Sequence, residues 1–148
     1  MSRATYALTI LLCASATSIA DDMPSELAKQ IKVFKTEDSS LSNGVLRIRV
    51  TTLVVNQATF RAIARASCWP LWMGGKKDGW AKARIDRVEV INLIGAQGFA
   101  FVGGRKSCAE WGNVTGENEN AYIASRTWVC VAGACRPRRD GEITSGDE

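Results

Sequence analysis

The sequence contains no histidine, only three prolines, and aromatic residues at 7%. Without histidine, the pairs of serine or cysteine with histidine that activate nucleophiles are excluded, and so are histidine-ligated metal sites. A glycine-rich phosphate-binding motif is also missing, because the run GGRK at residues 103–106 does not fit the P-loop pattern and is typical of a turn. These absences exclude most of the common catalytic classes.

Carboxylates are the residues that remain for enzyme chemistry. A pair of them could hydrolyse a glycosidic bond, but nothing in their spacing indicates that any two converge. We therefore expect a protein that is not an enzyme and holds neither a cofactor nor a metal, and we keep a carboxylate-dependent hydrolase as the least favoured alternative. Its candidate residues are Asp78, Asp86, Glu89 and Glu110.

The excess of positive charge is small, with a formal net charge of +4, and the basic residues are spread along the chain in small groups. A nucleic-acid-binding domain normally concentrates a larger excess of lysine and arginine on one face. We therefore expect no nucleic-acid partner.

Long hydrophobic runs are absent beyond the first twenty residues. Arg3 precedes residues 7–16, ALTILLCASA, which are uncharged and mostly apolar. This run is too short to span a bilayer, which needs ~20 apolar residues. Small residues, Ser18 and Ala20, occupy the positions that signal peptidase reads. The pattern predicts a signal peptide over residues 1–20, a periplasmic or secreted protein beginning at Asp21, and no membrane insertion after cleavage.

Four cysteines remain after the predicted cleavage, and an even number in an exported chain indicates two disulfides, with three possible connectivities. Strand-like alternation over residues 126–131 and the dipeptide Ala132-Gly133 predict a hairpin with a two-residue turn. This register places Cys130 opposite Cys135, which leaves Cys68 to pair with Cys108. A zinc site is disfavoured, because four residues separate Cys130 from Cys135, the other two cysteines are isolated and no histidine is present. A redox pair is disfavoured, because its C-x-x-C spacing is missing.

Two helices are expected from the periodicity of apolar residues. Residues 24–35 place Leu27 and Ile31 on one face, and a second helix begins after a capping Asn56 and extends to about Cys68. A strand competes for the second segment, because its apolar residues also alternate, but its alanines favour the helix. Strands are expected over residues 45–55, 82–94, 99–102, 122–131 and 134–136, with polar loops over 36–44 and 113–120.

The order of these elements predicts an α+β domain over residues 21–138, followed by a disordered acidic tail over 139–148. We expect an antiparallel sheet of about five strands, two helices on one of its faces, and stabilisation by two disulfides.

The most distinctive segment is residues 69–80, WPLWMGGKKDGW, which we expect to form a tryptophan-rich loop. Tryptophan and methionine are enriched at protein interfaces, and flat aromatic rings also bind glycans. We therefore predict a binding module whose partner is another protein, namely an envelope or secretion-system component or an enzyme that it inhibits, with a glycan as the alternative. The predicted binding residues are Trp69, Trp72, Met73, Lys76, Lys77 and Trp80.

A structural role for the tryptophans competes with recognition, because the rings could cover the end of the core beside the Cys68–Cys108 disulfide. In either case Trp69, next to Cys68, is expected to be the most buried ring and Trp72 the most exposed.

Overall fold

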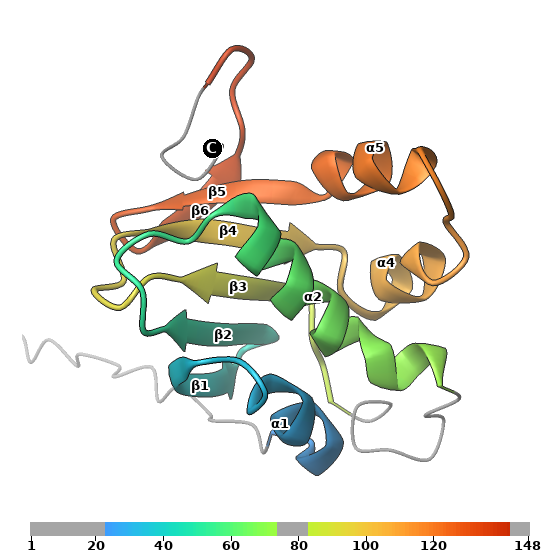
Figure 1. Cartoon of the computed structure of the whole chain (residues 1–148), viewed down its shortest axis with the longest axis horizontal. Coiled ribbons are helices and arrows are strands. Elements are labelled where there is room, and N and C mark those ends of the chain that lie inside the picture. The colour runs from blue at the N-terminus through green and yellow to red at the C-terminus, as the bar shows by residue number, and fades with distance from the viewer. Residues whose placement is uncertain (1–22, 74–82, 143–148) are drawn as a thin grey trace, which may run out of the picture.

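The computed structural model describes residues 23–73 and 83–142, and within them the chain forms four helices and six strands (Figure 1). The predicted signal peptide and residues 143–148 lie outside the described residues. The helices are α1 (Ser25–Ile31), α2 (Gln57–Trp72), α4 (Gly104–Trp111) and α5 (Asn118–Ser125). The strands are β1 (Thr36–Ser42), β2 (Val45–Val50), β3 (Arg87–Ile91), β4 (Gln97–Val102), β5 (Thr127–Val131) and β6 (Ala134–Pro137).

The six strands form one sheet in which the spatial order follows the chain order, β1 to β6. All neighbours are antiparallel except β2 and β3, which are parallel. The expected antiparallel sheet of about five strands is therefore wrong in detail: the described sheet is mixed and has six. The reason is α2, whose 16 residues return the chain to the side from which β2 started, so that β3 runs in the same direction.

The second helix begins where the sequence predicts. The side-chain Oδ1 of Asn56 accepts a hydrogen bond from the backbone N–H of Thr59 at 2.8 Å, which caps α2. The helical interpretation of this segment is therefore confirmed over the strand. The first helix is shorter than expected, since α1 ends at Ile31.

Three elements fall where the sequence predicts a loop or a strand. β1 occupies the predicted polar loop because it is an edge strand that buries only Leu41 and pairs with β2 across a turn at Asn43-Gly44. α4 and α5 lie over residues expected to be loop or strand, and α5 buries only Ile123. β1 and α5 each bury a single apolar side chain and so show no hydrophobic period, whereas in α4 the period is marked by only two large buried side chains, Cys108 and Trp111.

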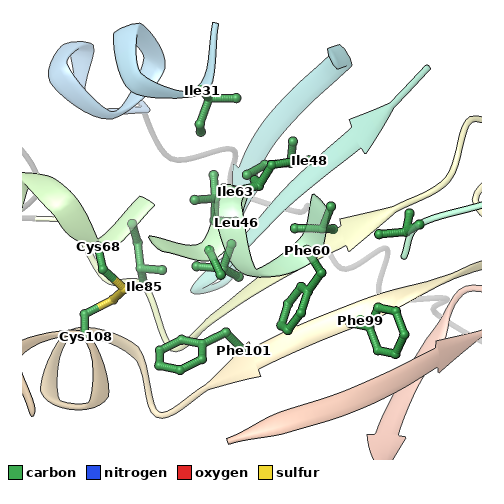
Figure 2. Close-up of a cluster of buried hydrophobic side chains, with 14 of the residues drawn as sticks. Ile31, Leu46, Ile48, Phe60, Ile63, Cys68, Ile85, Phe99, Phe101 and Cys108 are labelled. Atoms are coloured by element: carbon green, nitrogen blue, oxygen red, sulfur yellow. A yellow bond between two sulfur atoms is a disulfide. The ribbon is translucent and has the colours of Figure 1, made fainter. Parts of the chain in front are cut away.

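The main core lies on one face of the sheet (Figure 2). Alternate strand residues such as Ile48, Val90 and Phe101 pack there against α2. All four described helices contribute to this core, so they share one face, which corrects the expected two helices. Their buried side chains include Leu27 of α1, Ile63 of α2, Trp111 of α4 and Ile123 of α5.

Both predicted disulfides are present. Cys68 on α2 is joined to Cys108 on α4, and Cys130 on β5 is joined to Cys135 on β6. Cys130 lies directly opposite Cys135, one residue pair away from the turn, as the predicted register requires. The Ala132-Gly133 turn has positive φ angles of 50° and 81°, which suit a two-residue hairpin turn.

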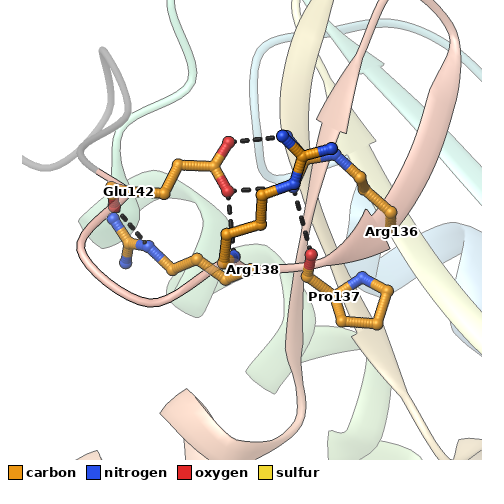
Figure 3. Close-up of polar contacts among 5 residues, drawn as sticks. Arg136, Pro137, Arg138 and Glu142 are labelled. Carbon is orange, nitrogen blue, oxygen red and sulfur yellow. Dashed lines mark hydrogen bonds and ion pairs between the residues drawn. The ribbon is translucent and has the colours of Figure 1, made fainter.

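The chain continues past β6 into a turn closed by Glu142 (Figure 3). The Glu142 carboxylate accepts hydrogen bonds from both terminal nitrogens of Arg136, at 2.9 and 2.6 Å, and from the backbone N–H of Arg139 at 3.0 Å. These bonds favour the ionised carboxylate and lower the pKa of Glu142 to about 2. Residues 139–142 of the predicted tail are thus held against β6.

Candidate functional site

The predicted tryptophan-rich loop begins as a helix. Trp69 and Trp72 lie in the last turn of α2, which continues past Pro70, so the prediction of a loop is wrong for residues 69–72. A proline inside a helix removes one backbone hydrogen bond, and here the packing of Trp72 and the neighbouring disulfide hold the last turn despite that loss. Lys76, Lys77 and Trp80 lie outside the described residues, and so does Asp78.

Trp72 is the most firmly held of the predicted binding residues. Its indole N–H donates to the backbone oxygen of Cys108 at 2.7 Å, and its ring meets those of Trp69 and Trp111 edge to face, at 5.9 and 5.6 Å. The guanidinium of Arg65 lies 5.7 Å from the ring centre. Trp72 therefore joins α2 to α4 and serves the structure.

The expected order of burial is wrong, because Trp69 is 43% exposed whereas Trp72 is half-buried. Met73, four residues after Trp69 on the same side of the chain, is 69% exposed. We call Trp69, Trp72, Met73 and Trp111 the tryptophan end. Only Trp69 and Met73 of this group offer substantial apolar surface to a ligand.

Three of the four candidate carboxylates lie within the described residues, and each has its own partners. Glu89 lies on the face of the sheet away from the helices, whereas Glu110 lies on α4 and accepts a hydrogen bond from the hydroxyl of Tyr122 at 3.0 Å. Burial first, and then the Glu110 carboxylate, raises the pKa of Tyr122 above 10. Asp86 pairs with Arg84 at the surface.

A second surface of interest is the face of the sheet opposite the helices, which we call the open face. A cavity of about 500 Å³ opens on it. Asp38, Arg47 and Arg49 form its wall on β1 and β2, and the Cys130–Cys135 disulfide forms the wall on β5 and β6. Glu89 and Ile91 of β3 lie between the two walls. We call this the open-face cavity.

Glu89 is a fully buried carboxylate with two arginine partners. Its Oε2 accepts a hydrogen bond from Nε of Arg47 at 2.8 Å and forms an ion pair with Nη2 of Arg47 at 2.7 Å, and its Oε1 accepts a hydrogen bond from Nε of Arg87 at 2.7 Å. The buried charge is thus paired and hydrogen-bonded, as a buried ion requires. In turn, Glu89 fixes the positions of two guanidinium groups that are still partly open to solvent.

A third surface lies at the end of the sheet where β2 and β3 finish and the β5–β6 hairpin turns (Figure 1). Four of the seven large apolar side chains that are exposed in the described part of the chain lie here, and we call them the loop end. Their exposed fractions are 67% for Leu53, 48% for Val54, 69% for Ile94 and 52% for Val131.

The loops that carry these side chains are locked to one another by hydrogen bonds. The side chain of Asn92 donates to the oxygen of Leu53 at 2.8 Å, and the side-chain amide of Gln97 bonds both the N–H and the oxygen of Val55, at 2.8 and 3.0 Å. The N–H of Ala132 donates to the oxygen of Ala96 at 2.8 Å, which joins the β5–β6 turn to the β3–β4 loop. The loop end is therefore a rigid surface.

Sequence reasoning missed the loop end, although a signal for it exists. Residues 51–60, 90–104 and 127–135 contain no charged side chain, in a chain of which 23% is charged. Each uncharged run includes one of the three connections, but their meeting depends on the strand order, which the sequence does not reveal.

None of the helices in the described part of the chain is long and apolar enough to cross a membrane.

In comparisons with known proteins, no family model, no curated protein and no solved structure matches the chain.

Proposed function

We propose that the chain is an exported, non-catalytic module that binds another protein through the loop end. The observation that carries this proposal is the combination of exposed aliphatic side chains and locked, uncharged loops at Leu53, Val54, Ile94 and Val131. The two disulfides are compatible with an oxidising compartment outside the cytoplasm.

Burying exposed aliphatic surface stabilises a complex by roughly 25 cal/mol per Å², and uncharged loops add no cost for removing charges from water. Association also costs the free energy of ordering flexible groups. At the loop end, hydrogen bonds from Asn92 and Gln97 already order the loops, so less of that cost remains.

The tryptophan end is the second candidate surface, because Trp69 and Met73 expose neighbouring apolar side chains. This surface could bind a protein or, through the ring of Trp69, a glycan. It offers two exposed apolar residues within the described chain, against four at the loop end, and we therefore rank it second.

Site-specific photo-crosslinking in cells that export the protein tests the two surfaces together. The photoreactive residue replaces Ile94 at the loop end, Met73 at the tryptophan end, or, as the control, the exposed Lys106 on α4. We expect a defined protein adduct from position 94 and none from position 106. An adduct from position 73 alone would move the binding site to the tryptophan end, and no adduct from position 94 would contradict the proposal.

A further inference from the structure

The open-face cavity adjoins the loop end, and its charge differs from that of the uncharged loops. We infer that it binds an acidic, extended segment of a protein, with carboxylates placed against Arg47 and Arg49. This inference rests on the proposed function in one respect, since it assigns the segment to the same partner that the loop end binds.

The two walls of the cavity differ in chemistry. Arg47 and Arg49 lie on the β2 side, whereas the Cys130–Cys135 disulfide and Gly133 form an uncharged wall on the other side. Ile91, which packs with Ala100 and Cys130 in a small second cluster, supplies apolar floor. An extended peptide alternates its side chains, so acidic residues could face the arginines while apolar residues face the disulfide.

The charges on this face favour an anion. The cavity is lined by equal numbers of positive and negative side chains, Arg47 and Arg49 against Asp38 and Glu89, but only 1% of the Glu89 side chain is exposed, whereas 44% of Arg47, 40% of Arg49 and 49% of Asp38 are exposed. Glu89 is fully buried, and both of its oxygens are already hydrogen-bonded. Arg47 uses Nε and Nη2 for Glu89, and its Nη1 has no hydrogen-bond partner among the described residues.

Arg47 is therefore held in a fixed orientation with donor capacity to spare. A guanidinium fork of this kind suits the planar carboxylate of an aspartate or glutamate. Arg49 pairs with Asp38 at the surface, where an incoming carboxylate can compete in solvent.

The position of the cavity links it to the loop end. Gly95, one of its lining residues, directly follows Ile94, and Gly133 lies two residues after Val131. A volume of about 500 Å³ lies within the range of ligand sites, ~300–1,000 Å³. A partner seated on the loop end can therefore extend one segment along the strands into the cavity.

The test uses the mature, disulfide-bonded chain, labelled with ¹⁵N, and a capped pentapeptide in which glutamate alternates with leucine. The control peptide has glutamine in place of glutamate. We expect saturable chemical-shift changes in β2, β3 and the β5–β6 turn with the acidic peptide alone, and weaker binding at higher ionic strength.

The variants are Arg49→Gln, Arg47→Lys and, as the matched control, Arg84→Gln. Arg84 forms a surface pair with Asp86, as Arg49 does with Asp38, but it lies outside the cavity. Arg49→Gln removes one partly exposed ionic contact, so it should raise the Kd of the peptide about three- to fivefold. Arg47→Lys keeps the charge beside Glu89 and loses the fork, so it should also weaken binding, whereas Arg84→Gln should leave the Kd unchanged.

Any one of three results would overturn the inference: equal binding of both peptides, chemical-shift changes located away from the open face, or the same Kd for Arg49→Gln and Arg84→Gln. These results are distinguishable from a failure of the proposed function. Peptide binding on the open face without an adduct at position 94 would reject the loop end alone. An adduct at position 94 without peptide binding would reject the cavity alone.

Discussion

Replacing Trp72 by alanine should destabilise the fold far more than replacing Trp69. Full removal of a buried tryptophan costs about 3–5 kcal/mol, and Trp72 is only half-buried, so we expect the lower part of that range, about 3 kcal/mol. About 1 kcal/mol of this is the hydrogen bond from its indole N–H to the oxygen of Cys108, and the rest is ring packing against Trp69 and Trp111.

The comparison variants separate these contributions. Trp72→Phe keeps a ring between α2 and α4 but loses the N–H donor, so it should cost about 1–1.5 kcal/mol. Trp69→Ala removes a ring that is 43% exposed and loses mainly the edge contact with Trp72, so it should cost about 1 kcal/mol or less.

Urea denaturation of the disulfide-intact chain, followed by circular dichroism, measures these costs as shifts in the transition midpoint at constant slope. If Trp72→Ala costs no more than Trp69→Ala, Trp72 does not join α2 to α4 as described. That result would also return Trp72 to the candidate binding residues.

Three further predictions concern the locked loops, the disulfides and the terminal turn. Gln97→Ala removes the side-chain amide that hydrogen-bonds both backbone groups of Val55. Denaturation should therefore show that the free energy of unfolding falls by about 1–3 kcal/mol, and hydrogen exchange of the Val55 amide should accelerate. Unchanged exchange would contradict the hydrogen-bonded locking of these loops. Replacing Cys68 and Cys108 by serine removes a disulfide that joins residues 40 apart, and in the chain-entropy model this should lower the free energy of unfolding by about 4 kcal/mol. Replacing Cys130 and Cys135, which are 5 apart, should lower it by only about 2 kcal/mol. The reverse order would contradict that model. Because folding lowers the pKa of Glu142 from 4.5 to about 2, its contribution to stability is present above pH 4.5 and is lost as the pH falls through about 2. NMR titration measures the pKa of this carboxyl group. An ordinary value would show that the turn does not form.

Local chemistry is what the sequence predicts well. The cap at Asn56 and the Cys130–Cys135 register each depend on residues close together in the chain. Once Cys130 is paired, Cys108 is the cysteine left for Cys68, so even this distant disulfide follows by elimination.

The features that the sequence does not predict depend on distant pairing. The parallel alignment of β2 and β3 is set by where α2 returns the chain, and β1 forms by backbone pairing with only Leu41 as a buried anchor. The open-face cavity joins residues from β1 to β6, so neither Glu89 nor Arg47 stands out before the strand order is known. The end of α2 is different, since there tertiary packing overrides the local signal of Pro70.

The central claim is that the loop end binds a protein. Its most direct test is isothermal titration calorimetry with the partner protein that is identified by crosslinking at position 94. The affinity of this partner is measured for the parent chain, for Leu53→Asp and for the matched control Val33→Asp. Val33 is 75% exposed and lies in the turn between α1 and β1, outside the loop end. A charge placed at an interface residue should weaken binding by about tenfold or more, so we predict that loss for Leu53→Asp and an unchanged Kd for Val33→Asp. Equal affinities of Leu53→Asp and the parent chain would contradict the claim.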